Sequence, residues 1–257
     1  MSLKIDKLFS LAGKVALVTG GSSGIGRTIA AGFIANGVRT YITGRNAERL
    51  EESAKALSGA APCIPIVANL SSKDGTDALA TKIAARESRL DILVNNAGAS
   101  WVQPIEEYSE AGWDRVFDLN AKAPFFLTQK LLPLMTRGEG EQDWARVINI
   151  GSTAAEQVDP QGSGYGPSKA AMHQLTRVMA RSLARHRITA NCIAPGMFPS
   201  RLSDQLDPKI RESWVSRCPV GRQGTAEDAA GTAIYLCSRA GAFTNGRIIV
   251  LDGGHMA

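Results

Sequence analysis

Residues 14–26 have the sequence KVALVTGGSSGIG, and this stretch decides the fold of the chain. A valine-rich run from Lys14 to Thr19 ends in glycines, and apolar residues at helical spacing follow from Ile25 to Ile34. This order predicts a strand, a tight turn and a helix. Regular alternation of short strands with helices predicts an α/β fold: a Rossmann-like doubly wound parallel sheet of about seven strands with helices on both faces. The further strands are expected at residues 39–43, 64–68, 91–94, 146–150, 188–193 and 248–251.

Several residues mark where helices should begin. Asn46 and Ser72 can each accept a backbone N–H at a helix start. Pro167 suits a first helical turn, and Thr225 with Asp228 has the spacing of a capping box. These residues predict the starts of four helices.

Two longer segments behave differently from the rest. Residues 109–135 carry apolar side chains at helical spacing and are expected to be helical. Between residues 195 and 224 the alternation breaks into a segment rich in Pro, Arg and Ser, with one short helix expected near residues 209–215. We predict that this second segment is a lid over a substrate.

The composition is that of a compact globular protein. The 257 residues are enough for one sizeable core, and 44% hydrophobic residues are too many for a disordered chain. The sequence has no apolar run near the roughly 18 to 20 residues that cross a bilayer, and its start lacks the apolar core of a signal peptide. We therefore expect a cytoplasmic protein without a membrane partner.

The charge and the cysteine and histidine spacing argue against a nucleic-acid-binding, metal-binding or disulfide-bonded protein. The net charge of +5 comes without a basic cluster interleaved with aromatic residues, so an ordinary basic surface is preferred and no nucleic-acid partner is expected. The cysteines and histidines lack metal-ligand spacing and the cysteines form no C-x-x-C pair, so we expect neither a metal site nor disulfides. These residues are Cys63, Cys192, Cys218, Cys237, His173, His186 and His255.

The glycine turn follows the first strand, where α/β proteins hold a phosphate. Backbone N–H groups and the helix dipole can bind a pyrophosphate there, and Gly20, Gly24 and Gly26 are expected to give the backbone its freedom. Glycines alone would also suit an ordinary tight turn, and the position of this cluster favours a dinucleotide cofactor. The contacts expected from this turn are Gly20, Ser22, Ser23, Gly24, Ile25 and Gly26.

The end of the second strand bears on the choice of cofactor. An acidic residue there would bind the free ribose hydroxyls of NAD. The sequence instead has Arg45 without an adjacent carboxylate, and a guanidinium suits the 2′-phosphate of NADP. NADPH is therefore the preferred cofactor, with NADH possible. The alternative is that Arg45 is a solvated surface charge.

Three residues have the chemistry of carbonyl reduction. Tyr165 and Lys169 are four residues apart and share one face of a helix. Tyrosine normally ionises near pH 10, so it needs nearby positive charge to act as an acid or base at neutral pH. Ser152 directly follows the fifth strand, at an edge of the sheet where ligands bind, and its hydroxyl can polarise a carbonyl. Each residue taken alone also has a structural explanation.

These motifs together resemble the short-chain dehydrogenase/reductase family over nearly the whole chain. The matching motifs are T-G-x-x-x-G-x-G at residues 19–26, N-N-A-G at residues 95–98, Asn120, the Ser152, Tyr165 and Lys169 set, and P-G at residues 195–196. The resemblance implies one NAD(P)-binding oxidoreductase domain over residues 1–257, with the lid at about residues 195–224. It also implies that the chain is an enzyme rather than a cofactor-binding regulator without turnover, which is the alternative from another class.

The resemblance assigns roles to individual residues. It implies that Tyr165 is the general acid, that Ser152 orients the substrate oxygen, and that Lys169 holds the nicotinamide ribose and favours the phenolate. Asn120 would position a water that passes protons to Lys169. The further cofactor contacts that it implies are Asn69, Leu70, Asn96, Ala97, Gly98, Ile193, Pro195 and Gly196.

Two positions depart from the family pattern. Asn69 stands where an aspartate often meets the adenine, although its amide oxygen can still accept that hydrogen bond. Ser23 stands where many NADPH-dependent members have a basic residue, so Arg45 must carry most of the preference for the phosphate.

The substrate class is predicted from the branch of the family that the sequence resembles. Stretches F-S-L-A-G-K, N-N-A-G-x-S-W, Y-G-P-S-K-A-A and P-G-x-F-P-S-R resemble 3-oxoacyl reductases of the type associated with rhamnolipid synthesis. This resemblance implies a 3-oxoacyl thioester, contacted by Ser152, Trp101, Met197 and Phe198. A polyol or a sugar acid of the gluconate type is the alternative, because close relatives differ widely in substrate. A homotetramer that packs the helices containing Asn120 and Lys169 is also implied.

Overall fold

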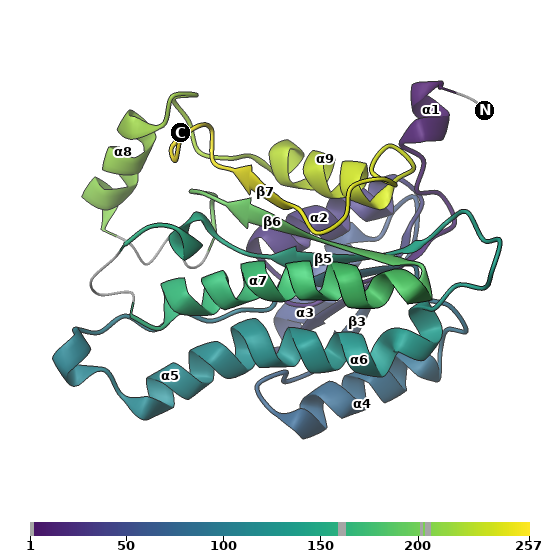
Figure 1. Ribbon diagram of the computed structural model, residues 1–257, viewed down its shortest axis with the longest axis horizontal. Helices are drawn as coiled ribbons and strands as arrows, with labels where there is room; N and C mark the ends of the chain where they lie inside the picture. The colour runs from purple at the N-terminus through teal and green to yellow at the C-terminus, as the bar shows by residue number, and fades with distance from the viewer. Residues whose placement is uncertain (1–2, 159–162, 201–202, 204–206) are drawn as a thin grey trace.

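One parallel sheet of seven strands forms the centre of the computed structural model, which describes residues 3–158, 163–200, 203 and 207–257 (Figure 1). The strands lie in the order β3-β2-β1-β4-β5-β6-β7, and the predicted doubly wound sheet is confirmed. The strands are β1 (Val15–Val18), β2 (Arg39–Gly44), β3 (Cys63–Val67), β4 (Ile92–Asn95), β5 (Ala145–Ile150), β6 (Ile188–Pro195) and β7 (Ile248–Leu251).

The helices are α1 (Ile5–Leu8), α2 (Gly24–Ala35), α3 (Ala47–Leu57), α4 (Lys73–Ala84), α5 (Glu110–Phe117), α6 (Ala123–Met135), α7 (Tyr165–Leu183), α8 (Pro208–Arg217) and α9 (Ala226–Cys237), with short turns η1 (Ile105–Glu107), η2 (Asp118–Lys122), η3 (Thr153–Ala155) and η4 (Ala184–His186). Helices α2 to α9 lie in the connections between consecutive strands, as expected for a parallel sheet, and α1 precedes β1. Among the described residues, no helix is long and apolar enough to cross a membrane.

The predicted helix starts are present. Asn46 accepts a hydrogen bond from the Arg49 N–H at 2.8 Å, and Ser72 caps α4 in the same way. Thr225 and Asp228 form the predicted capping box of α9. Helix α7 begins at Tyr165, two residues before the proline that predicted it.

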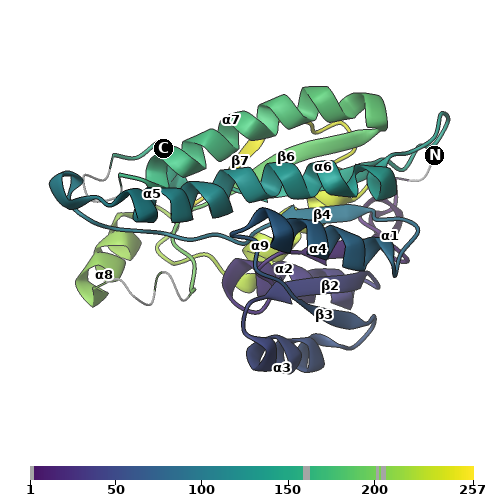
Figure 2. The same ribbon diagram turned by 90° about the horizontal axis from the view of Figure 1, so that it is seen from below.

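Side chains alternate between the two faces of the sheet. Helices α4, α6 and α7 cover the face that is nearer in Figure 2, and α2 and α9 lie on the other face. In β1, Ala16 and Val18 pack with α2, α3 and α9, whereas Leu17 packs with α4, α6 and α7. All three β1 side chains are fully buried. The strands are therefore held rigidly, and the loops at their ends are well positioned to carry a site.

The chain reverses direction across the sheet between β1 and β4. It first builds outward from β1 to β3 and then returns to β4 on the other side. In sheets of this kind ligands bind outside the carboxyl ends of the strands at this reversal. Helix α8 and the C-terminus lie at this edge, and α1 lies at the opposite edge (Figure 1).

Residues 109–135 are not one uninterrupted α-helix. The π turn η2 separates α5 from α6, and it contains Asn120. A π turn inserts an extra residue into a helix, often at a functional site. The apolar spacing predicted helix correctly here, but it did not predict the interruption at η2.

The predicted lid is only partly described. Strand β6 runs on to Pro195, and α8 spans the short helix expected near residues 209–215. Residues 201–202 and 204–206 of this segment lie outside the described residues.

Candidate active site

The glycine turn leaves the start of α2 open. Gly20 and Gly24 have φ values of 65° and 54°, a conformation that strongly favours glycine. Ser23 is the N-cap residue, and its side chain makes no capping hydrogen bond. The first N–H groups of α2 are thus available to an anion, as a pyrophosphate site requires.

Gly26 is needed for space and not for conformational freedom, which corrects the prediction for this residue. It lies within α2 and is absent from the positive-φ glycines. A Cβ atom there would lie 2.3 Å from Nδ2 of Asn96. Asn96 Nδ2 in turn donates to the carbonyls of Thr19 at 2.8 Å and Gly20 at 3.2 Å. The Asn96 side chain therefore fastens the turn to the end of β4.

The N-N-A-G segment also binds the turn through its backbone. The N–H groups of Asn96 and Ala97 both donate to Oγ1 of Thr19, at 2.9 and 3.0 Å. Gly98 is exposed and lies beside Asn120 and Lys169, because a Cβ there would be 3.1 Å from Asn120 Oδ1 and 3.7 Å from Lys169 Nζ. This segment thus links the glycine turn to the Tyr165 region.

Arg45 lies at the carboxyl end of β2, beside the glycine turn. It follows Gly44, where a Cβ would lie 3.1 Å from Ser22 Oγ. Arg45 is exposed, and it has no ion-pair partner within the described ranges. Its guanidinium is free to meet an anion next to the phosphate-binding turn.

The Asn69 side chain already has a partner. Its amide oxygen accepts a hydrogen bond from the Ser71 N–H at 3.2 Å, forming a turn after β3. Asn69 is exposed and Leu70 is buried. A carbonyl oxygen has two lone pairs, so a second hydrogen bond to Asn69 stays open.

The structure brings Tyr165 and Lys169 together on the first turns of α7. Lys169 is only 6% exposed, and its Nζ donates to the Ile150 carbonyl at 2.8 Å. The same Nζ lies 5.7 Å from the centroid of the Tyr165 ring. The Tyr165 hydroxyl has no hydrogen-bond partner in the part of the chain that the structure describes. The buried ammonium is therefore held beside an unengaged phenol.

Ser152 lies next to this pair, two residues after Ile150. Its Oγ accepts a hydrogen bond from the Ala154 N–H at 3.1 Å, so Ser152 does cap a short turn. The turn η3 packs against α7. Because a hydroxyl that accepts one hydrogen bond can still donate its proton, the capping role leaves Ser152 able to polarise a carbonyl.

Asn120 is 2% exposed and uses its side chain within the protein. Its Oδ1 accepts from the Ala99 N–H, and its Nδ2 donates to the Ala99 carbonyl, each at 2.8 Å. Nδ2 also donates to Ser168 Oγ at 3.0 Å, and Ser168 donates to the Tyr165 carbonyl at 2.7 Å. The Asn120 side chain thus braces the Tyr165 turn, and it has one oxygen lone pair left for the predicted water.

Two positioning residues were missed from the sequence. Ser168 lies inside the quoted Y-G-P-S-K motif, so its position three residues after Tyr165 was an available signal. Tyr108 had none: its hydroxyl donates to the Trp101 carbonyl at 3.2 Å and accepts the Gly164 N–H just before Tyr165. Its partners lie on loops distant in sequence.

The histidines show no metal chemistry. His173 is 4% exposed and lies behind Gly151, where a Cβ would come within 2.4 Å of its Nε2. Burial lowers the pKa of His173, so it is neutral at pH 7. Within the described residues, no group of His, Cys, Asp or Glu is arranged to hold a metal ion.

The residues expected to contact the substrate lie in two places. Met197 and Phe198 follow Gly196 and line a cavity of about 160 Å³ together with Trp214 of α8. Trp101 packs against α5, where a Cβ on Gly112 would lie 2.5 Å from its ring, and its Nε1 donates to Gln103 at 2.6 Å. The two groups stay separate predictions.

Comparisons with known proteins agree with this geometry. A family model described as Enoyl-(Acyl carrier protein) reductase matches residues 20–256. The rhamnolipids biosynthesis 3-oxoacyl-acyl-carrier-protein reductase of Pseudomonas aeruginosa is 46% identical over 249 residues, 96% of this chain and 97% of that protein. Gluconate 5-dehydrogenase of Gluconobacter oxydans is 35% identical over 255 residues, 96% of each. The solved Pseudomonas aeruginosa RhlG/NADP active-site complex has a TM-score of 0.92 at 45% identity, covering 97% of this chain and 99% of that one.

The sheet, the glycine turn and the Ser152, Tyr165 and Lys169 arrangement define a dinucleotide-dependent oxidoreductase. The chain belongs to the short-chain dehydrogenase/reductase family.

Proposed function

We propose that this enzyme reduces the ketone of a 3-oxoacyl thioester to a secondary alcohol with NADPH. The observation that carries the proposal is the hydrogen bond from Lys169 to the Ile150 carbonyl, which holds a buried cation beside Tyr165. Ile150 ends strand β5, and Ser152 follows it two residues later. A phenol, a hydroxyl and a cation around one point are suited to protonating a carbonyl oxygen.

The chain's residues divide the reaction between them. When NADPH is bound, its nicotinamide would supply the hydride that the carbonyl carbon receives. Ser152 donates a hydrogen bond to the carbonyl oxygen, and Tyr165 transfers its phenolic proton to that oxygen, which completes the alcohol. Lys169 stabilises the resulting phenolate by its positive charge. Asn120 positions the turn through Ser168 and takes part in returning a proton from water.

The cofactor is held by the segments at the carboxyl ends of five strands, β1, β2, β3, β4 and β6. The open start of α2 fits the pyrophosphate, and the unpaired Arg45 fits the ribose 2′-phosphate. Asn69 and Leu70 lie on the adenine side, and Pro195 and Gly196 on the nicotinamide side. The Pseudomonas aeruginosa structure with NADP supports the same preference in this chain.

The lid completes the domain. The chain forms one domain, and the described part of the segment 195–224, in which Met197, Phe198 and α8 border one cavity, covers the substrate. Phe198 and Met197 supply apolar contact from this segment, and Trp101 supplies it from the loop after β4. The cavity beside Phe198 and the identity to a 3-oxoacyl reductase support an acyl substrate. A gluconate-type sugar acid is the second candidate, supported by the Gluconobacter oxydans relative.

The protein assembles as a homotetramer. Large apolar side chains are exposed on α5, α6 and α7, and patches of this kind mark contact surfaces. Trp113, Phe125 and Phe126 are 41%, 39% and 42% exposed, and Val178 on α7 is 47% exposed. Light scattering should give four times the chain mass, and Phe126→Glu should reduce it; a wild-type monomer contradicts the assembly.

The deciding experiment compares initial rates on acetoacetyl and longer 3-oxoacyl thioesters, a crotonyl thioester and gluconate. Each substrate is tested with NADP(H) and NAD(H), in the wild type and Tyr165→Phe. NADPH-dependent reduction of the 3-oxoacyl thioesters, lost in Tyr165→Phe, is expected. Activity confined to gluconate would replace the substrate class, reduction of the crotonyl thioester alone would replace the reaction, and full activity of Tyr165→Phe would overturn the mechanism.

A further inference from the structure

A hollow of about 660 Å³ lies at the amino ends of β1, β4 and β5, at the edge of the sheet opposite to the candidate active site. Strands of four to six residues separate the two edges by roughly 13 to 20 Å. The size is within the range of about 300 to 1,000 Å³ that is common for small-molecule sites. Its walls come from the loop before β1, the residues before β4 and β5, and the turn after α9.

The walls of this hollow have an excess of positive charge. The five cations outnumber the three carboxylates by two. Its charged residues are Lys7, Lys14, Arg89, Arg146, Arg239, Glu87, Asp91 and Asp143.

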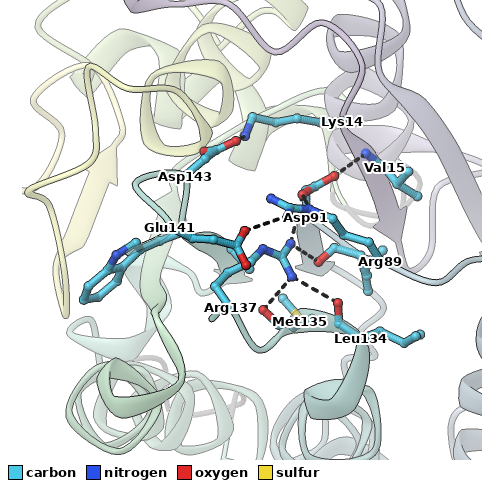
Figure 3. Close-up of polar contacts among 12 residues, drawn as sticks. Lys14, Val15, Arg89, Asp91, Leu134, Met135, Arg137, Glu141 and Asp143 are labelled. Carbon is cyan, nitrogen blue, oxygen red and sulfur yellow. Dashed lines mark hydrogen bonds and ion pairs between the residues drawn. The ribbon is translucent and has the colours of Figure 1, made fainter. Parts of the chain in front are cut away.

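All three carboxylates are already paired. Asp91 binds Arg89 and Arg137, and Asp143 pairs with Lys14 (Figure 3). Glu87 accepts the Tyr41 hydroxyl at 2.7 Å and pairs with Arg39. The carboxylates therefore do not neutralise the remaining cations of the hollow.

Arg146 is the buried member of this group. It is 2% exposed, and no carboxylate lies within ion-pair distance among the residues that the structure describes. Its Nη1 donates to the Trp144 carbonyl at 2.6 Å, while its Nε is buried without a partner. Burial lowers the pKa of this guanidinium, yet arginine stays charged at neutral pH. An unpaired buried charge is costly unless a counter-ion or water meets it.

Lys7 and Arg239 stand at the rim of the hollow, and both are exposed. Neither has an ion-pair partner within the described ranges. Three cations without a carboxylate partner in the described part of the chain, one buried and two exposed, thus line one hollow. A phosphate monoester carries a charge of about −1.5 to −2 at pH 7, which these three cations can neutralise.

We propose that this hollow binds a small phosphorylated molecule, whose phosphate is met by Arg146, Lys7 and Arg239. The guanidinium of Arg146 gives a planar donor set that suits phosphate geometry. The rest of the hollow has room for an organic group against Ala12, Gly13 and Ala242. This site is separate from the phosphate-binding turn and does not depend on the proposed reaction.

Calorimetric titration of the NADP-saturated enzyme at fixed ionic strength tests the proposal. Inorganic phosphate and methyl phosphate are the probes, and the saturating cofactor keeps them from the glycine turn. We expect saturable binding at one site per chain. Removing two charged hydrogen bonds in Lys7→Gln/Arg239→Gln should weaken it at least tenfold.

The control is Lys55→Gln/Lys82→Gln, which removes the same charge from exposed positions on α3 and α4. It should bind both probes like the wild type. Binding of methyl phosphate at least as tight as that of inorganic phosphate would support a site for phosphate esters, whereas exclusion of methyl phosphate would restrict the site to the free ion and overturn the proposal. Absence of saturable binding to the wild type, or equal weakening in both double variants, would overturn the proposal.

Discussion

At the carboxyl ends of the strands polar side chains keep hydrogen-bonding capacity free, whereas at the amino ends most charges bind one another. Among the described residues, the Tyr165 hydroxyl has no hydrogen-bond partner and the Arg45 guanidinium has no ion-pair partner. The helix start at Ser23 has no side-chain cap. At the other edge, Asp91 binds Arg137 at 2.9 Å, and both are buried (Figure 3). The same residue chemistry thus serves recognition at one edge and cohesion at the other.

The edge at the amino ends of the strands, which we call the cohesive edge, joins elements that are distant in sequence. Asp91 accepts from the Val15 N–H at 2.9 Å and from Arg89 at 2.7 Å. Arg137 donates to the carbonyls of Leu90 at 2.7 Å and Met135 at 2.8 Å. The network ties β1, β4 and the end of α6 together, so its loss should affect stability and not catalysis. The carboxyl edge should show the reverse.

The largest expected effect is that of Lys169→Met on catalysis. Turnover should fall by about 10² to 10⁴-fold, the range for losing acid–base assistance. The free energy of unfolding should not fall, because methionine fills the space without a buried charge. Initial rates measure the turnover, and urea unfolding measures the free energy of unfolding. Lys122→Met, at an exposed lysine, is the matched control and should change neither. A large loss of stability in Lys169→Met would make this lysine part of the cohesive framework.

The second prediction concerns the opposite edge. Asp91→Ala leaves the Arg137 guanidinium buried without its carboxylate, so the free energy of unfolding should fall by about 3 to 5 kcal/mol. Activity per folded molecule should stay near that of the wild type. Asp77→Ala removes a partly exposed ion-paired carboxylate and should lower the free energy of unfolding far less than Asp91→Ala does. Equal costs in urea unfolding would show that Asp91 has no special structural role.

Local sequence signals predicted those features whose determining residues lie close together in the sequence. The seven strands, the caps at Asn46 and Ser72, and the Thr225–Asp228 capping box depend on residues within a few positions of each other. The glycine turn and the Tyr165–Lys169 spacing are local in the same way. Such signals therefore located the candidate site.

Partners that the fold brings together could not be predicted. Asp91 and Arg137 are 46 positions apart, and Asn120 and Ser168 are 48 apart. From the sequence, Gly26 is predicted to give the turn conformational freedom. Its true role, leaving space for the Asn96 side chain, depends on a contact that only the folded structure brings about. The positioning shell around the site depends on such distant contacts, so sequence reasoning found the reacting groups but not their supports.

The third prediction concerns the unpaired guanidinium at the end of β2. Arg45→Ser should lower the ratio of kcat/KM with NADPH to that with NADH by about 10 to 100-fold, because a charged hydrogen bond is worth about 1.5 to 3 kcal/mol. Lys55→Ser removes an exposed cation on α3 and should leave the ratio unchanged. An unchanged ratio in Arg45→Ser would show that Arg45 is only a solvated surface charge.

The smallest effect is a pH dependence at the cohesive edge. Burial alone would raise the pKa of Asp91, but the hydrogen bonds from Arg89 and Val15 and the nearby positive charges outweigh it, and its pKa lies below the ordinary value. A carboxyl with a lowered pKa in the folded state stabilises the fold above its unfolded pKa of about 3.9, and this stabilisation is lost as the pH falls toward the folded pKa.

The difference in free energy of unfolding between the wild type and Asp91→Asn should therefore be constant above about pH 5 and shrink below about pH 4. Urea unfolding across this pH range measures it. Asparagine cannot ionise, so Asp91→Asn removes this contribution while keeping the shape of the side chain. If the difference does not change with pH, the charge of Asp91 is unimportant and its hydrogen bonds alone hold the edge. The contrast between the two edges would then be one of hydrogen-bond geometry and not of charge.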